Sequence, residues 1–82
     1  VMVKPALAYL DVIALFKQSS PVPVAAYNVS GEYAAVKLLS KSGLADEKQL
    51  TLENLTAITC AGASIIVSYH TRDILKNGWL TN

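Results

Sequence analysis

The sequence of 82 residues has little charge and almost no cysteine. Charged residues make up 16% of it, whereas an average globular domain has about 25%. Seven Lys and Arg offset six Asp and Glu without forming a basic run, so no nucleic-acid partner is expected. The single cysteine, Cys60, excludes a disulfide scaffold and is consistent with a reducing compartment, and we expect it to be a small buried residue.

Uninterrupted apolar runs long enough to cross a membrane are also absent, so no membrane partner is expected. The most apolar stretches, 1–16 and 57–69, are too short or are interrupted by Lys4 and Asp11. Apolar residues nevertheless make up 52% of the chain, which excludes a disordered protein. This composition predicts that part of the surface is buried against something that the sequence does not contain.

Three short apolar segments predict β-strands, near residues 2–3, 24–29 and 65–68. The second and third lack polar alternation, which is typical of parallel strands covered on both faces. Helical spacing predicts helices over 8–17 and 32–42, a third that ends near Ala61-Gly62, and a short one after Thr71. The order β-α-β-α-α-β-α predicts an α/β fold with a parallel sheet and right-handed crossovers.

Three apolar parallel strands cannot be covered on both faces by so few helices. The chain therefore either oligomerises heavily or is a piece of a larger α/β fold. We favour a piece of a larger fold, because Val1 begins the sequence inside an apolar run, with no loop before the first strand.

Residues that can do chemistry follow each predicted strand. In α/β folds the functional groups collect at the carboxyl ends of the parallel strands. Here Lys4, Ser30 and Tyr69-His70 occupy those positions and should meet on one rim of the sheet. A lysine buried there would have a lowered pKa and could attack a ketone as a neutral amine. A serine at a helix start offers its hydroxyl and backbone N–H groups to a carboxylate or phosphate.

Each of these residues also has a purely structural interpretation. Lys4 could leave the sheet and extend to water, and Ser30 could cap the helix that follows it. Tyr69 could be a core aromatic residue whose hydroxyl is satisfied. His70 has no Cys, Asp or Glu at ligand spacing, so no metal site is expected in this sequence.

Several segments together resemble one enzyme family, porphobilinogen synthase, which is also called 5-aminolevulinate dehydratase. The most specific block is Val29-Ser30-Gly31-Glu32-Tyr33, at the end of the apolar run that starts at Val22. The resemblance runs over the whole sequence but covers only the C-terminal part of the family's chain. The other segments that carry it are Met2-Val3-Lys4-Pro5, Tyr9-Leu10-Asp11, Ala61-Gly62-Ala63, Ser68-Tyr69-His70 and Trp79-Leu80.

The resemblance implies the last three βα units of a (β/α)8 TIM barrel, with residues 1–82 as the C-terminal part of one barrel domain. It also implies condensation of two 5-aminolevulinate molecules to porphobilinogen, the pyrrole precursor of haem and chlorophyll, by a homo-octamer in the cytoplasm or in plastids. Lys4 matches the lysine that forms a Schiff base with the first-bound substrate. Ser30 and Tyr69 match the pair that hydrogen-bonds the carboxylate of that substrate. Family enzymes use zinc or magnesium, and the ligands belong to family segments that this sequence lacks.

One departure from the family is the segment Cys60-Ala61-Gly62-Ala63-Ser64, where the family usually has Arg-Ala-Gly-Ala-Asp. The loss of an acid and a base together indicates that a structural salt bridge is replaced. The resemblance favours a fragment of an active synthase, itself inactive alone because the site for the second substrate lies mostly elsewhere.

Two alternatives to an active synthase stay open. The chain could be a non-catalytic remnant of the enzyme that acts as a structural or assembly subunit. Such a remnant would have no reason to keep Lys4, Ser30 and Tyr69 together. A different Schiff-base barrel enzyme, such as an aldolase, is a weaker alternative, against which the block 29–33 argues.

Overall fold

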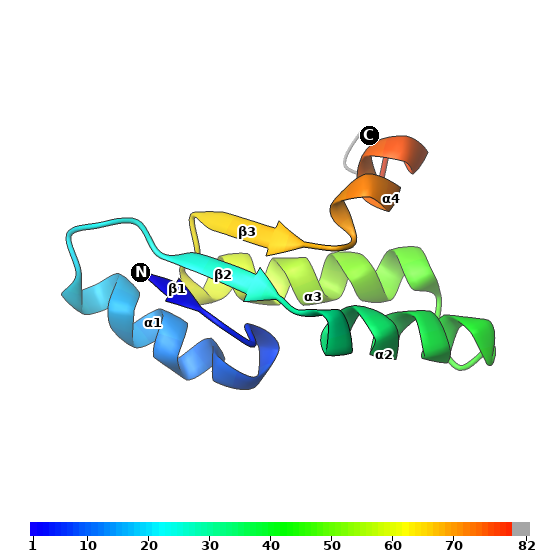
Figure 1. Cartoon of the computed structure of the whole chain (residues 1–82), viewed down its shortest axis with the longest axis horizontal. Coiled ribbons are helices and arrows are strands. Elements are labelled where there is room, and N and C mark those ends of the chain that lie inside the picture. Colours follow the sequence, from blue (N-terminus) through cyan, green and yellow to red (C-terminus); the bar gives the residue numbers. More distant parts are fainter. Residues whose placement is uncertain (80–82) are drawn as a thin grey trace.

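The computed structural model describes residues 1–79, so Leu80, a part of the resemblance, lies outside the described residues. The chain alternates between strands and helices as the sequence predicts (Figure 1). The elements in chain order are β1 (Met2–Val3), a short 3-10 helix (Leu7–Tyr9), α1 (Leu10–Ser19), β2 (Ala25–Asn28), α2 (Ser30–Lys41), α3 (Glu47–Ala61), β3 (Ile65–Ser68) and α4 (Thr71–Asn77).

The strands form one parallel sheet in the order β1-β2-β3, which confirms the predicted topology. Met2 pairs with Ala25, and Ala25 pairs in turn with Ile65. At the other end of β2, Asn28 pairs with Ser68. All strands point the same way, so their carboxyl ends meet at one edge of the sheet (Figure 1).

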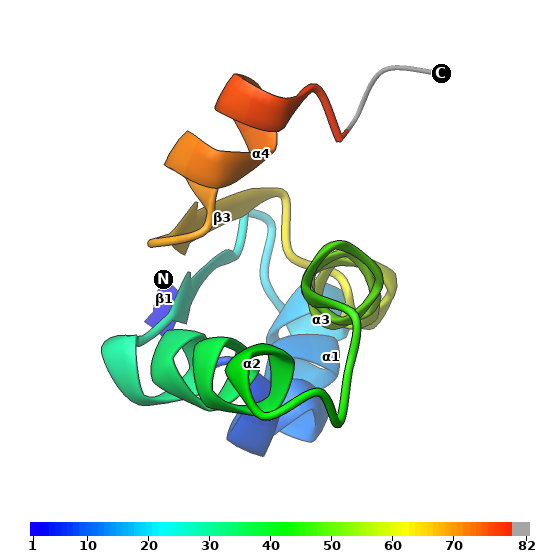
Figure 2. The same cartoon turned by 90° about the vertical axis from the view of Figure 1, so that its right-hand side faces the viewer.

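The helices α1 and α3 cover one face of the sheet. Its inward side chains, Val3 and Ala26, join a core with Ile13 of α1 and Ile58 of α3. Figure 2 shows these two helices on the same side of the sheet. Burial of this kind stabilises the fold by about 25 cal/mol for each Å² of apolar surface that leaves water. The packing of α1 and α3 thus buries and stabilises this face of the sheet.

The opposite face of the sheet is left open by the residues that the structure describes. Met2, Ile65 and Val67 alternate with less exposed positions and are 51%, 56% and 45% exposed. Apolar residues arranged side by side in this way mark a surface that another layer of protein covers. The structure therefore agrees with the prediction that part of this surface is buried against something that the sequence does not contain.

The helix starts differ from the sequence predictions in two places. Helix α2 begins at Ser30, with Val29 at the N-cap, so the prediction that Ser30 caps a helix starting at Glu32 is wrong. Helix α4 begins at Thr71, with His70 and not Thr71 at the N-cap position. Asp46 is the N-cap of α3, where its side chain accepts hydrogen bonds from two backbone N–H groups and satisfies part of the helix start.

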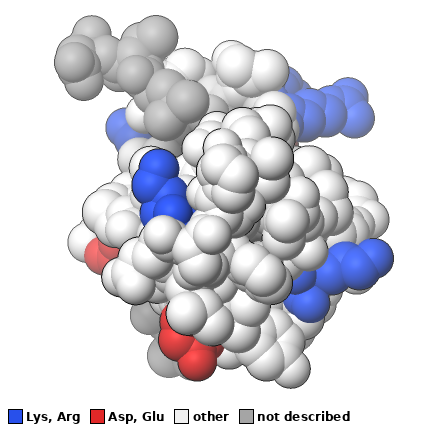
Figure 3. Space-filling view, turned by 90° about the vertical axis from the view of Figure 1, so that its left-hand side faces the viewer, with Lys and Arg blue, Asp and Glu red and all other residues white. Residues whose placement is uncertain are grey.

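The surface of the chain carries few charges. The face at the left-hand end of Figure 1 shows scattered basic and acidic side chains among a majority of uncharged residues (Figure 3). Within residues 1–79, no helix combines the length and the apolarity needed to span a membrane.

Candidate functional site

The candidate site lies at the carboxyl edge of the sheet, where Lys4, Ser30 and Tyr69 follow β1, β2 and β3. Lys4 and Ser30 are exposed, and Tyr69 is 52% exposed. In the part of the chain that the structure describes, no hydrogen bond joins any two of them. The fold thus brings the three predicted residues to one edge and leaves their polar groups open to solvent.

Tyr69 is fixed by two other tyrosine rings. The ring centroid of Tyr69 lies 6.2 Å from that of Tyr27 and 5.7 Å from that of Tyr33. The Tyr27 hydroxyl donates a hydrogen bond of 3.1 Å to the Tyr69 hydroxyl, and this bond raises the pKa of Tyr27. Tyr27, Val67, Ser68 and Tyr69 line a hollow of about 240 Å³. The interpretation of Tyr69 as a core aromatic is therefore wrong, although its hydroxyl does have a partner.

A chain of hydrogen bonds joins the ends of the strands beneath this hollow. The Ser68 hydroxyl donates to Asn28 Oδ1 over 2.8 Å, and Asn28 Nδ2 donates to Glu32 Oε1 over 2.7 Å. The other carboxylate oxygen of Glu32 accepts the backbone N–H of Leu7 over 2.8 Å. Asn28 is fully buried, so its hydrogen bonds remove a large penalty for its burial. This network connects the segment after Lys4 with the starts of α2 and α4.

The sequence analysis did not find this network. Asn28 breaks an otherwise apolar strand and precedes Glu32 by four residues. A polar residue inside a buried strand needs a hydrogen-bond partner, and that rule is the signal that could have found it.

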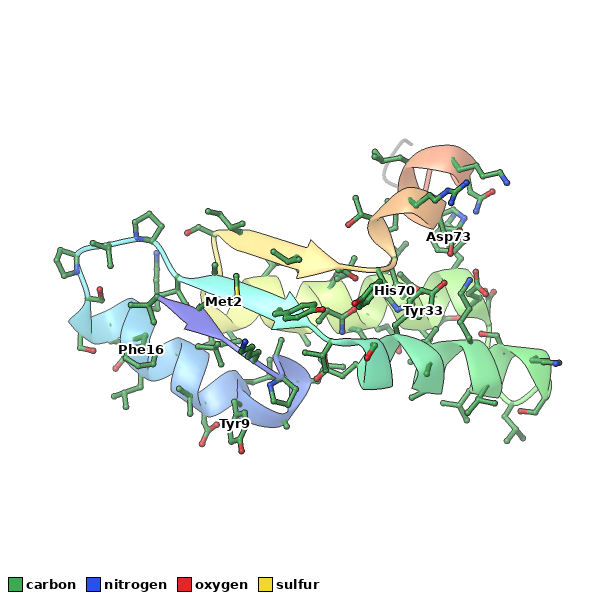
Figure 4. The ribbon with its side chains drawn as sticks, viewed as in Figure 1. Met2, Tyr9, Phe16, Tyr33, His70 and Asp73 are labelled. Carbon is green, nitrogen blue, oxygen red and sulfur yellow. The ribbon has the colours of Figure 1, made fainter. Side chains whose placement is uncertain are left out.

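His70 is the second polar residue buried at this edge. It is fully buried, and neither ring nitrogen has a hydrogen-bond partner in the described part of the chain. Its ring centroid lies 4.7 Å from that of Tyr33, and Figure 4 shows the two rings side by side between β3 and α2. Burial, together with the positive charge of Lys37, lowers the pKa of His70. The imidazole is therefore neutral at pH 7.

Lys37 links the helices around His70. Its ammonium group lies 3.0 Å from Glu47 of α3 and 2.8 Å from Asp73 of α4, and 5.4 Å from the centre of the Tyr33 ring. Both ion pairs raise the pKa of Lys37, and the Lys37 charge lowers the pKa of Asp73. These contacts hold α2, α3 and α4 together at the edge that carries the candidate site.

Residues 1–79 contain no group of three or more His, Cys, Asp or Glu side chains that could hold a metal ion. His70 does not fit a metal ligand either, since the carboxylates of its surroundings, Glu47 and Asp73, are engaged by Lys37. Cys60 is exposed near the end of α3, so the prediction that it is buried is wrong. The residue lies on the solvent side of the helix that packs beneath the sheet.

Three comparisons place the chain among known proteins. The family model described as delta-aminolevulinic acid dehydratase matches residues 1–77. Relatives described as delta-aminolevulinic acid dehydratase occur in Synechocystis, 51% identical over 80 residues, and in Mycobacterium tuberculosis, 52% identical over 81 residues. These alignments cover 98% and 99% of this chain but 24% of each relative, so the chain spans about a quarter of their length.

A solved structure extends the comparison to three dimensions. The delta-aminolevulinic acid dehydratase (porphobilinogen synthase) of Toxoplasma gondii, solved with its reaction product porphobilinogen, matches with a TM-score of 0.89 and 43% identity. The match covers 92% of this chain and 21% of that chain. The prediction of an α/β fold made of three βα units of a TIM barrel is therefore confirmed.

Proposed function

The chain belongs to the delta-aminolevulinic acid dehydratase family, and on that basis we propose that it is the C-terminal barrel segment of a porphobilinogen synthase. In this proposal residues 1–82 act within a longer polypeptide, which we refer to as the complete enzyme. The complete enzyme condenses two molecules of 5-aminolevulinate to porphobilinogen, a step of tetrapyrrole and haem synthesis. The observation that carries the proposal is the placement of Lys4, Ser30 and Tyr69 at the carboxyl ends of three adjacent parallel strands.

Lys4 is the proposed nucleophile. Its neutral amine attacks the ketone carbon of 5-aminolevulinate, and loss of water then leaves a Schiff base between Lys4 and the substrate. The reaction requires an amine without its proton, and removal of surrounding water favours that form. Lys4 is exposed in this chain, so we assign its desolvation to the other strands of the barrel, which would cover the open face.

Ser30 and Tyr69 are the proposed ligands of the substrate carboxylate. Ser30 is the first residue of α2, where the positive end of the helix dipole favours an anion. The Tyr69 hydroxyl accepts a hydrogen bond from Tyr27, which leaves its own proton available for a carboxylate oxygen. Two hydroxyl groups that hold the charged end of a keto acid would orient its ketone toward the lysine.

The remaining properties of the complete enzyme follow from family membership and are part of the proposal. We assign it a homo-octameric assembly in the cytoplasm, or in plastids if its source is photosynthetic. Zinc or magnesium would be bound by residues outside this segment, and no step proposed for Lys4, Ser30 or Tyr69 depends on the metal. The isolated chain would be inactive, since it lacks most of the site for the second substrate.

Borohydride trapping tests this proposal. The complete enzyme is incubated with 5-aminolevulinate, reduced with borohydride, digested, and analysed by mass spectrometry. The adduct should lie on the peptide that contains Lys4, and Lys4→Ala should remove both the adduct and turnover. Lys41→Ala, in which an exposed lysine of α2 is lost, is the matched control and should retain both.

The proposed ligands are tested separately from the nucleophile. Ser30→Ala and Tyr69→Phe should raise the KM for 5-aminolevulinate and still allow trapping at saturating substrate. Near-normal turnover by Lys4→Ala would refute the assignment of the nucleophile. A complete enzyme that forms no adduct and no pyrrole would instead support the alternative of a non-catalytic assembly subunit.

A further inference from the structure

The burial of the polar His70 side chain is energetically unfavourable. An imidazole carries at least one N–H donor and, when neutral, one acceptor nitrogen. Both ring nitrogens are buried, and no residue between positions 1 and 79 forms a hydrogen bond with them. A buried polar group that gains no hydrogen bond costs free energy, so this position requires another explanation.

What the His70 ring does contact is Tyr33, at 4.7 Å between ring centroids (Figure 4). Tyr33 also contacts the ring of Tyr69, at 5.7 Å, so one tyrosine packs against two consecutive residues at the end of β3. Tyr33 lies three residues after Ser30, which places the two on neighbouring positions of the first turn of α2. The Tyr33 ring therefore joins the start of α2 to the corner between β3 and α4.

We propose that His70 is a positioning residue, which holds Tyr69 in its place for substrate through the ring of Tyr33. The inference rests on the proposed function, because it takes Tyr69 as a ligand of the substrate carboxylate. Tyr69 and His70 share a peptide bond at the strand end, and the backbone N–H of His70 donates to Ser68 Oγ over 3.1 Å. A buried His70 ring thus fixes the direction in which the neighbouring Tyr69 leaves the strand.

The surroundings of His70 indicate a role in packing and not in proton transfer. Among residues 1–79, neither nitrogen has a hydrogen-bond partner to which it could pass a proton. The charged groups that influence His70 are Lys37, Glu47 and Asp73, and Lys37 forms ion pairs with both acids. A second positive charge on His70 would be repelled by the Lys37 ammonium group. A neutral aromatic ring of similar size should therefore perform the same task.

The test compares His70→Ala with His70→Phe in the complete enzyme. We expect His70→Ala to raise the KM for 5-aminolevulinate by about five- to tenfold, with kcat changed by less than about twofold, because only substrate binding is loosened. The adduct on Lys4 should still form at saturating substrate. His70→Phe, which keeps an aromatic ring against Tyr33, should restore a KM near that of the unmodified enzyme.

Two further variants separate positioning from general destabilisation. Ile74→Ala removes a buried side chain from the same helix α4 and keeps all three rings, so it should leave the KM unchanged. In a Tyr69→Phe background, His70→Ala should change the KM for 5-aminolevulinate by less than about a further twofold, because the residue that His70 positions has already lost its hydroxyl. If His70→Ala fails to fold, Tyr33→Leu breaks the same ring contact and should give the same rise in KM.

The outcomes distinguish this inference from the proposed function. If Tyr69→Phe raises the KM while His70→Ala and Tyr33→Leu do not, the inference is overturned and the proposed function stands. The inference would also be overturned if His70→Ala raised the KM by the same factor in the unmodified enzyme and in the Tyr69→Phe background. If the unmodified enzyme forms no adduct on Lys4, the proposed function fails and the inference fails with it. If Tyr69→Phe leaves the KM unchanged, the proposed role of Tyr69 fails, and the inference again fails with it.

Discussion

The hydrogen bonds of Glu32 should make a measurable contribution to the stability of the site. Its carboxylate accepts one bond from the Asn28 side chain and one from the Leu7 backbone, at 2.7 and 2.8 Å. A hydrogen bond to a charged group contributes about 1.5–3 kcal/mol, and the lower figure applies because Glu32 is only half-buried. Glu32→Ala removes both acceptors, so we expect the free energy of unfolding to fall by about 3 kcal/mol.

Urea unfolding of the complete enzyme and hydrogen exchange at the Leu7 amide measure this effect. The Leu7 amide should exchange at least about tenfold faster in Glu32→Ala, since it loses its acceptor. Glu53→Ala is the matched control: its carboxylate accepts an exposed bond from Gln49 on α3 and should change stability by less than about 0.5 kcal/mol. Glu32→Gln keeps one acceptor oxygen, so its loss of unfolding free energy should lie between those of Glu32→Ala and Glu53→Ala. Equal unfolding curves for Glu32→Ala and Glu53→Ala would refute the reasoning.

Two further predictions concern pH and backbone geometry. The fold lowers the pKa of His70 from its ordinary value of 6.5, so the unfolded chain takes up a proton at this residue first as the pH falls. The free energy of unfolding should therefore decline from about pH 6.5 downward, until His70 is protonated in the folded state as well. In urea unfolding at several pH values, His70→Phe should lack this part of the decline. Gly62 has φ +127°, and an added Cβ would lie 2.7 Å from Cβ and Cγ of Lys17. Backbone strain alone costs about 1–2 kcal/mol, so Gly62→Ala should lower the free energy of unfolding by more than that amount. Gly43→Ala, at φ +78° with nothing within 4 Å, measures that strain by itself, and equal losses for the two would contradict the predicted clash.

The parallel sheet could be predicted because short segments of the sequence indicate its strands and the helices between them. Apolar runs that end at Lys4, Asn28 and Ser68 fix the strands, and the helices between them leave only parallel crossovers. Once the strands are parallel and adjacent, the residues that follow them must share one edge. The positions of Lys4, Ser30 and Tyr69 at that edge are therefore a consequence of chain order and could be predicted without knowledge of any contact.

The contacts that organise the edge could not be predicted in the same way. The bond from Asn28 to Glu32 joins residues four positions apart, but those from Leu7 to Glu32 and from Ser68 to Asn28 join residues 25 and 40 positions apart. Such pairs depend on the register between strands and on the angle at which α2 leaves the sheet, and neither is encoded in a short segment. The exposure of Cys60 depends likewise on which side of α3 faces the core.

The two parts of the candidate site differ in how much of the complete enzyme they need. The corner that carries Ser30 and Tyr69 is held by contacts within this chain: the rings of Tyr27 and Tyr33, and the bond from Ser68 to Asn28. The surroundings of Lys4 are not completed by contacts within this chain. Its side chain is exposed beside an apolar sheet face that no described residue covers. A carboxylate ligand works while partly hydrated, whereas an amine nucleophile needs its proton removed, which desolvation favours. Under the proposed function, this segment would therefore supply the carboxylate ligands by itself, while the reactivity proposed for Lys4 would depend on the strands that close over it.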